Sequence, residues 1–158
     1  MICVKIVASD NEIVMEINEN FLIETNEKVL LREKERTGKG VYIETVPQNL
    51  AQVLPKVSEY GNSGNIEEDL IQKAAAIMAA IPWIQAFFDG NRRTSIVAAG
   101  TFLRDNGYEL DISTEEENTE LRKMLSEIKK HRRDLEPTIM KQLFLYISKR
   151  MNKYESKT

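Results

Sequence analysis

The spacing of apolar residues along the chain predicts a mainly helical protein. Between about residues 20 and 36, apolar positions recur with the period of a helix, and Gly38 follows as its C-terminal stop. A second helix is expected to start at Glu67, and its run AAAIMAA consists of small residues that let another helix approach closely. Pro82 is expected to end or kink this helix, because proline lacks the backbone donor.

Four further segments have helical patterns: 48–57 (interrupted by Pro55), 91–106 (with Asn106-Gly107 as its stop), a segment capped by Ser113 or Thr114, and one that opens at Pro137. Glu116 or Glu117 would complete a capping box in the third of these. Gly100 is placed on the buried face of the 91–106 helix, and Met151 on the buried face of the last helix.

Extended structure is predicted only near the N-terminus and in one short connector. Residues 2–7 and 12–17 are β-branched and partly alternating, and the turn-like ASDN between them predicts a hairpin. GKGVYIETVP alternates briefly, whereas residues 58–65 form a Gly- and Asn-rich loop. We therefore expect one mainly α domain over 1–158, with residues 1–18 as an N-terminal hairpin extension.

Composition and charge narrow the classes of function. The net charge is −3, from 22 basic and 25 acidic residues, so no global field attracts the chain to nucleic acid or anionic membranes. No apolar run approaches the roughly 20 residues of a membrane span, and the first residues lack the pattern of a secretory signal. The single cysteine, Cys3, fits a reducing compartment, and we expect a soluble cytoplasmic protein. One cysteine and one histidine, His131, cannot form a Cys/His zinc site.

The segment AFFDGNRRTS, residues 86–95, places an acid, a glycine, an amide and two arginines at the predicted start of a helix. A helix N-terminus directs backbone N–H groups and a favourable dipole at an anion, and Gly90 lets the backbone come close to it. Asn91 would cap the helix or bond a phosphate oxygen. Arg92 and Arg93 oppose the helix dipole, and an anionic ligand would remove that conflict.

Asp89, just before the glycine, is a hard oxygen donor suited to a Mg²⁺ ion that bridges phosphates. Together with the basic residues it predicts a Mg²⁺–polyphosphate site. The same residues also fit an ordinary Asp-Gly turn that leads into a helix with two solvated arginines, and the residue types alone leave both interpretations open.

The segment also resembles the signature of the Fic/Doc family, a loop of pattern His-x-Phe-x-(Asp/Glu)-Gly-Asn-x-Arg between two helices. QAFFDGNRRT fits this pattern at every position except the first, and the matching residues are Phe87, Asp89, Gly90, Asn91 and Arg93. TFLRDNGYEL is similar to the family's usual continuation, and the resemblance extends over about residues 20 to 150. It implies a Fic/Doc-like helical bundle whose active-site helix–loop–helix spans 67–106.

The resemblance implies a transferase that uses ATP, or another nucleoside triphosphate, with Mg²⁺ to modify a hydroxyl of a protein target. Asp89 would then hold the metal, and the phosphates would be held by Gly90, Asn91, Arg92 and Arg93. Fic members mostly transfer AMP, whereas Doc-type members transfer a terminal phosphate. Ile96 stands where the Fic subset has a second arginine, and GNRRT is closer to the Doc form, which favours phosphoryl transfer. The resemblance is also compatible with an antitoxin partner or with self-association.

Gln85 is the departure from the pattern, because the family has a histidine there that takes the proton from the attacking hydroxyl. A glutamine amide hydrogen-bonds a hydroxyl but cannot hold its proton, and loss of such a base typically costs about 10²–10⁴ in rate. Three interpretations remain: a natural variant with weak or altered activity, an inactive ligand-binding relative, or a histidine replaced deliberately to silence a toxic enzyme.

Three other stretches have a functional and a plain interpretation. GVYIET, 40–45, lies where the family has a flap that pairs with the target's backbone, and it fits a connector equally well. STEEEN, 113–118, fits the family's inhibitory pattern (Ser/Thr)-x-x-x-Glu-(Gly/Asn), as SGNIEE, 63–68, nearly does, but a capping box explains the former. KKHRR, 129–133, complements the dipole of a helix that begins with acids.

The leading hypothesis is therefore a Fic/Doc-like transferase in which Gln85 impairs the base position and Asp89 and Arg93 keep their catalytic roles. The alternative is a non-catalytic regulatory or interaction domain that retains the nucleotide site. A third is a plain helical interaction module in which the loop is only structural.

Overall fold

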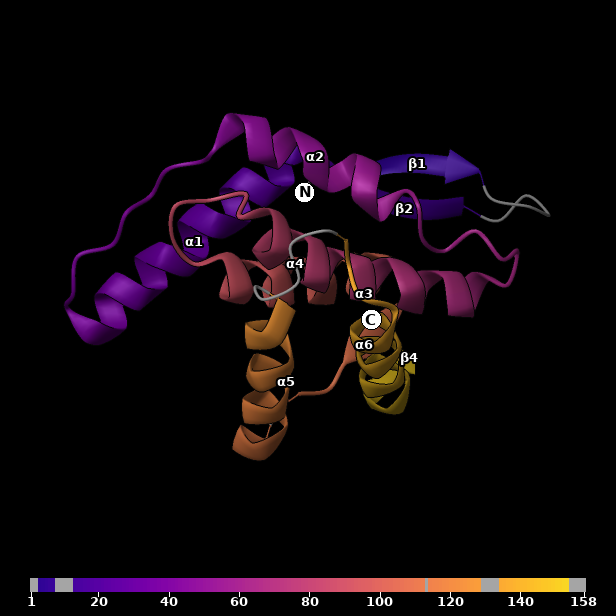
Figure 1. The fold of residues 1–158 in the computed structure, drawn as a ribbon. Helices are drawn as coiled ribbons and strands as arrows, with labels where there is room; N and C mark the ends of the chain where they lie inside the picture. Colours follow the sequence, from indigo (N-terminus) through magenta and orange to yellow (C-terminus); the bar gives the residue numbers. More distant parts are fainter. Residues whose placement is uncertain (1–2, 8–12, 113, 129–133, 154–158) are drawn as a thin grey trace, which may run out of the picture.

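The structure is a computed structural model that describes residues 3–7, 13–112, 114–128 and 134–153. Its elements in chain order are β1 (Cys3–Val7), β2 (Ile13–Ile17), α1 (Glu19–Thr37), α2 (Pro47–Val57), α3 (Ile66–Ile84), α4 (Asn91–Asp105), β3 (Tyr108–Leu110), α5 (Glu115–Ile128), α6 (Pro137–Arg150) and β4 (Met151–Lys153), as labelled in Figure 1. The fold is mainly α, as expected. None of the helices in the described ranges is both long and apolar enough to cross a membrane.

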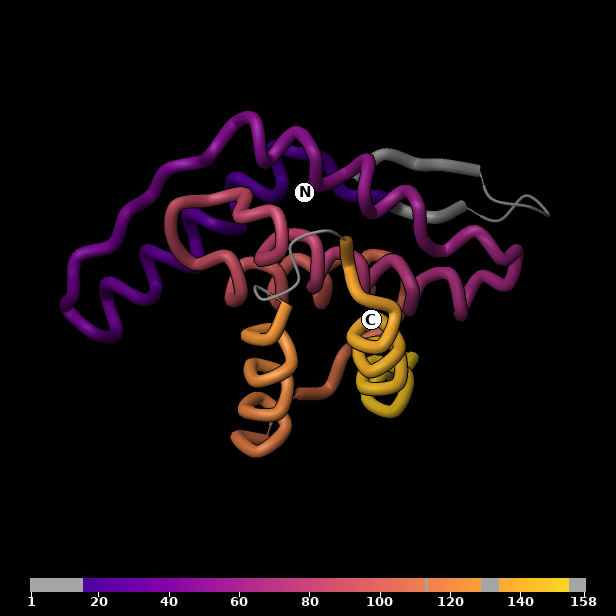
Figure 2. Tube along the Cα trace, in the orientation of Figure 1, coloured from indigo at the N-terminus to yellow at the C-terminus, as the bar shows by residue number. Residues whose placement is uncertain are grey.

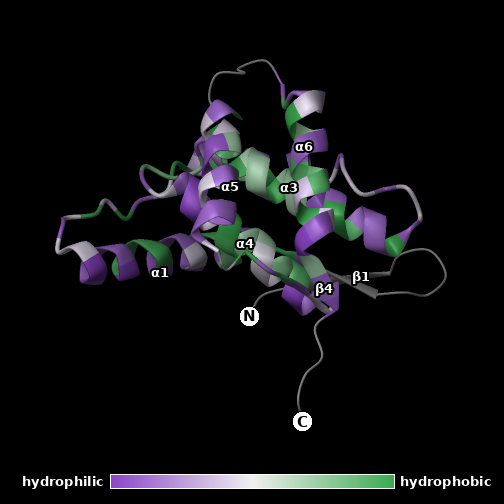
Figure 3. Cartoon of the chain, turned by 90° about the horizontal axis from the view of Figure 1, so that it is seen from below, coloured by the Kyte–Doolittle hydropathy of each residue, from purple (hydrophilic) through white to green (hydrophobic). Residues whose placement is uncertain are grey.

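Helix α3 is the central element of the core. From Leu70 to Pro82 nearly every residue is buried, because the helix is apolar on all sides and α2, α4, α5 and α6 all contact it. Its contact with α4 is the most extensive between any two of the described elements, as the small residues of AAAIMAA allow. Figure 3 shows hydrophobic residues along α3 and α4 and hydrophilic residues at the outer end of α1.

Neither Pro82 nor Pro55 ends its helix at its own position. α3 continues past Pro82 to Ile84, and α2 runs through Pro55 without interruption. Each proline lies in the last turn of its helix, where the missing N–H removes a single hydrogen bond and the chain is about to leave the helix. In α4, Gly100 does not face the core as expected, since a Cβ added there would meet no atom within 4 Å.

The expected N-terminal hairpin is present, with β1 antiparallel to β2 and Cys3 opposite Ile17. A second antiparallel pair, β3 with β4, was not predicted. Met151 begins β4 and so lies beyond α6, which corrects its expected place in the helix, although its partly buried side chain does pack against the core. The strand that β4 joins, β3, comes directly after α4.

The connector between α1 and α2 returns past the loop that joins α3 to α4, as the tube in Figure 2 shows. Residues 40–45 do not form a regular strand: Thr45 forms an isolated antiparallel bridge with Phe87. Two backbone hydrogen bonds flank this bridge, from Val46 N to Ala86 O at 2.9 Å and from Phe88 N to Glu44 O at 3.0 Å. The connector therefore covers one side of the α3–α4 loop.

Candidate nucleotide-binding site

The loop 85–90 begins at a residue in an unusual conformation. Gln85 ends α3 with φ of 59°, and it is the only non-glycine residue with positive φ in the described part of the chain. Its backbone N–H donates to Ile81 O at 2.9 Å, which closes the last turn of the helix. Its side-chain Nε2 donates to Pro82 O at 2.5 Å, so the amide also satisfies one of the carbonyls that a helix end leaves unpaired.

Asn91 ties the two ends of the loop together. Its buried side chain accepts from Phe87 N at 2.9 Å and donates to Phe87 O at 2.7 Å. The same Nδ2 atom lies 3.3 Å from Gln85 Oε1. The side chain expected to cap the helix or bond a phosphate is thus engaged with the loop, while its backbone N–H remains at the helix start.

Two asparagines from other helices hold the loop from outside. Asn26 of α1, which is buried, donates to Asp89 O at 2.9 Å and to Thr94 Oγ1 at 3.1 Å. Asn49 of α2 donates to Gln85 O at 3.0 Å. Because these partners are backbone carbonyls and a buried hydroxyl, the contacts fix the path of the loop without using the side chains of Gln85 and Asp89.

Helix α4 starts at this loop with an open N-terminus. Gly90 is its N-cap, with φ of 75°, and no side-chain hydrogen bond caps the helix. The left-handed conformation favours glycine at this position, and a Cβ there would press on the Leu30 side chain, 2.9 Å from its Cδ2. No acidic residue lies in the first turn of α4, which instead carries Arg92 and Arg93. This combination favours an anion.

The open helix start faces a cavity of about 680 Å³, a size typical of small-molecule sites. Its walls come from α1, the connector to α2, the loop 85–90, α4 and the first half of α5. Charged and polar walls are joined by apolar ones, which are Val29, Leu30, Val41, Phe88, Ile96, Val97 and Ile112. The lining therefore combines apolar surface with charged and polar groups.

Arg93 forms an ion pair with Glu33 of α1 inside this cavity. The Glu33 Oε2 atom is fully buried, and both side chains are only partly exposed. Burial, and next the nearby positive charge of Arg122, lower the pKa of the Arg93 guanidinium. The acid that contacts Arg93 is therefore Glu33 of α1. It does not come from residues 63–68 or 113–118, the two stretches that resemble the inhibitory pattern.

The residues at the loop fit a metal that is shared with a ligand. Asp89 is exposed and lines the cavity. Within the described residues no three His, Cys, Asp or Glu side chains gather at one place to hold an ion by themselves. A Mg²⁺ ion here would take the Asp89 carboxylate together with phosphate oxygens and water, which is how this ion commonly binds in phosphate sites.

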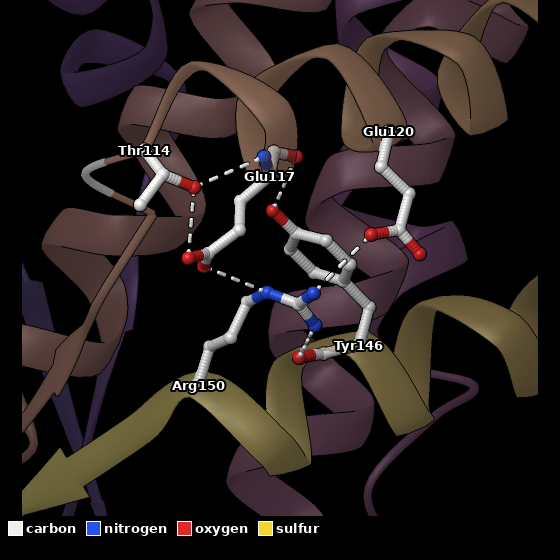
Figure 4. A network of polar contacts seen from close by, with 5 residues as sticks. All are labelled: Thr114, Glu117, Glu120, Tyr146 and Arg150. Atoms are coloured by element: carbon white, nitrogen blue, oxygen red, sulfur yellow. Dashed lines mark hydrogen bonds and ion pairs between the residues drawn. The ribbon is translucent and has the colours of Figure 1, made fainter.

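The stretch STEEEN has the structural role that its capping box predicts. The Thr114 hydroxyl accepts from Glu117 N at 3.2 Å and donates to Glu117 Oε1 at 2.9 Å. Glu117 Oε2 accepts from Arg150 Nε of α6 at 2.9 Å, as Figure 4 shows, so this glutamate is held away from the cleft. Ser113 and KKHRR, with His131, lie outside the described residues.

The architecture is a helical domain in which the loop between α3 and α4 and the start of α4 line one cavity. A family model described as Fic/DOC family matches residues 9–103, which is more than half of the chain, and the chain therefore belongs to the Fic/DOC family. Searches of curated proteins and of solved structures found no match.

The structure brings all the residues predicted for the site into one cavity. These are Gln85, Asp89, Gly90, Asn91, Arg92 and Arg93. Sequence reasoning missed Asn26, Glu33 and Arg122. Asn26 and Glu33 share the α1 face that carries Leu30, and a polar residue inside an apolar stripe is a signal that could have identified Asn26.

Proposed function

We propose that this protein binds ATP, or another nucleoside triphosphate, with Mg²⁺ in the cavity at the start of α4, and belongs to the transferases that modify a hydroxyl of a protein target. The observation that carries the proposal is the convergence of an uncapped helix start, Arg92, Arg93 and Asp89 in one cavity with an apolar wall. The reducing compartment suggested by the single cysteine supports a cytoplasmic setting.

Each residue has a physical role in this proposal. The backbone N–H groups at the start of α4 and the two arginines would bind the phosphates, and the Asp89 carboxylate would hold the metal. Bound Mg²⁺ supplies neutralisation of the charge that develops on the phosphates during transfer. Asn26 and Asn91 act as positioning residues, because they fix the loop through hydrogen bonds to its backbone.

Gln85 limits the activity of the chain as it stands. Its amide cannot accept a proton from a hydroxyl, and it is already bonded to Pro82 O and close to Asn91. A histidine in its place would tolerate the left-handed conformation better than most residues. If its Nδ1–H donated to Pro82 O, its Nε2 would be free to take a proton.

The same contacts support a second candidate, a nucleotide-binding domain without catalysis. Both ends of the Gln85 amide have partners on the helices that flank the loop, Pro82 O of α3 and Asn91 Nδ2 of α4, so glutamine stabilises the loop in the absence of any base function. This candidate and the first one share the ligand and differ only in turnover.

Gln85→His separates the two candidates. We expect ATP–Mg²⁺ binding by both forms, and transfer to target proteins that rises by about 10²–10⁴ in the histidine form. ATP labelled at the α- or the γ-phosphate distinguishes AMP transfer from phosphoryl transfer. Binding without labelling by either form would favour the non-catalytic domain, and absence of binding would remove both candidates.

A further inference from the structure

Two arginines from different helices line the same cavity. Arg93 lies in the first turn of α4, and Arg122 lies in the middle of α5. Asn118 precedes Arg122 by one helical turn and also lines the cavity, whereas Leu121 and Leu125 are fully buried in the core. The i, i+4 spacing therefore directs one face of α5 toward the cleft and the neighbouring face toward α3.

The cleft holds more positive charge than its own acids balance. Glu33 pairs with Arg93, which leaves Asp89 as the other acid in the lining, against Lys39, Arg92 and Arg122. No acid among the described residues forms an ion pair with Arg122. The pKa of the Arg93 guanidinium is lowered mainly by burial and, as a second cause, by the nearby positive charge of Arg122. Repulsion between two arginines is relieved when an anion lies between them.

Contacts with α6 hold the start of α5 in place, and α5 in turn carries Arg122. Arg150 of α6 donates through Nε to Glu117 at 2.9 Å and through Nη2 to Glu120 at 3.2 Å. The Tyr146 hydroxyl donates to Glu117 O at 2.7 Å. Figure 4 shows these four residues of α5 and α6 meeting in one network with Thr114.

We propose that Arg122 forms the second wall of the phosphate site, so that a polyphosphate chain lies between Arg93 of α4 and Arg122 of α5. The inference rests on the proposed nucleotide binding and adds α5 to the site. A single phosphate bound at the start of α4 engages only the α4 side, whereas a triphosphate reaches both. Arg122 therefore selects ligands by the number of their phosphates.

The test compares Mg²⁺–ATP and AMP as calorimetric ligands of the full chain, its Arg122→Gln variant and its Lys123→Gln variant. Lys123 is the matched control, because it is an exposed cation on the same helix that does not line the cavity. Loss of one charge-assisted contact at the partly exposed cleft should weaken Mg²⁺–ATP by about tenfold in Arg122→Gln. AMP binding in that variant, and both ligands in Lys123→Gln, should change by less than about twofold.

Each other outcome is decisive. If the unaltered chain binds Mg²⁺–ATP and Arg122→Gln binds it equally well, or if Lys123→Gln weakens it as much, the role of Arg122 is wrong and the nucleotide site stands. If the unaltered chain binds no Mg²⁺–ATP, both the proposed function and this inference are overturned. Thermal unfolding of the variants, expected within a few degrees of the unaltered chain because Arg122 and Lys123 are exposed, confirms that they fold.

Discussion

Helix α3 and the loop that follows it are neighbours in the chain and are held by opposite means. In α3, burial of apolar side chains on all sides supplies the stabilisation, and α2, α4, α5 and α6 all pack against it. The loop 85–90 is instead held by amide side chains from α1, α2 and α4, each bonded to its backbone. The core thus sets the stability of the protein, while directed hydrogen bonds set the shape of its ligand site.

The difference predicts that stability and ligand binding respond to different substitutions. Core variants should lower the free energy of unfolding and leave the affinity of the folded protein unchanged. Loop variants should lower affinity more than their effect on stability suggests, because the N–H groups at the start of α4 lose their alignment.

The largest effect is expected for Ile77→Ala in α3. Ile77 is fully buried in the core, and its truncation should cost about 2–5 kcal/mol in the free energy of unfolding, measured with urea. Leu145→Ala, at a side chain that is 48% exposed, is the control and should cost well under half as much. Equal losses in the two variants would show that α3 is not the centre of the core.

Asn91→Ala should come next, at about 2 kcal/mol, because it leaves the buried backbone N–H and carbonyl of Phe87 without partners. Unlike Ile77→Ala, it should also weaken Mg²⁺–ATP binding at least tenfold in the folded protein, measured by calorimetry. The control is Asn62→Ala, which removes an exposed amide contact to Ser58 O. Unchanged affinity in Asn91→Ala would mean that ligand binding does not depend on the hydrogen bonds between Asn91 and Phe87.

A smaller effect is expected on the pH dependence of stability, through Tyr146 of α6. Burial is the main reason that the pKa of Tyr146 is raised from 10.0 to about 12. As the pH rises, the Tyr146 phenol loses its proton in the unfolded chain before it does so in the folded protein. The contribution of the protonated phenol to the free energy of unfolding is therefore complete below pH 10 and is lost as the pH rises toward 12. Between pH 9 and 11 the unaltered chain should lose about 1 kcal/mol more than Tyr146→Phe, measured by urea unfolding at each pH. Parallel losses would contradict the assigned burial of the phenol.

The smallest effect is expected at Glu33 of α1, whose carboxylate pairs with Arg93 at the start of α4. Glu33→Gln frees Arg93 from a competing carboxylate, so Mg²⁺–ATP affinity should rise by about threefold, while stability should change by less than about 1 kcal/mol. Glu35→Gln, at an exposed position of the same helix, should leave affinity unchanged. Weaker binding in Glu33→Gln would show that this carboxylate positions Arg93 for the ligand and does not compete with it.

The sequence allowed the helices to be predicted well because their signals are local. Apolar periodicity and caps placed α1 and α4 within a residue or so, and Gly38 and Gly107 follow them as left-handed residues at or just beyond the helix ends. The β3–β4 pair escaped prediction because each strand has three residues and its partner lies in a distant part of the sequence. Met151 continued the apolar spacing of α6, and only pairing with Leu110 reveals it as a strand residue.

The site was predictable where its residues are consecutive and not where they converge from separate helices. Asp89, Gly90 and Arg93 belong to one short motif, which also led to the family. Glu33 and Arg122 are ordinary charged residues in their own helices, and only the packing of α1 and α5 around the cleft brings them to Arg93. The amide roles of Asn26 and Asn91 likewise depend on tertiary hydrogen bonds.

A calorimetric titration of Mg²⁺–ATP into the unaltered chain and into Arg93→Gln tests whether the start of α4 binds the phosphates of a nucleotide. Glutamine retains a donor for Glu33, so the variant should fold. We expect saturable binding by the unaltered chain and at least tenfold weaker binding by Arg93→Gln. Absence of binding by the unaltered chain, or equal binding by both, would contradict phosphate binding at the start of α4.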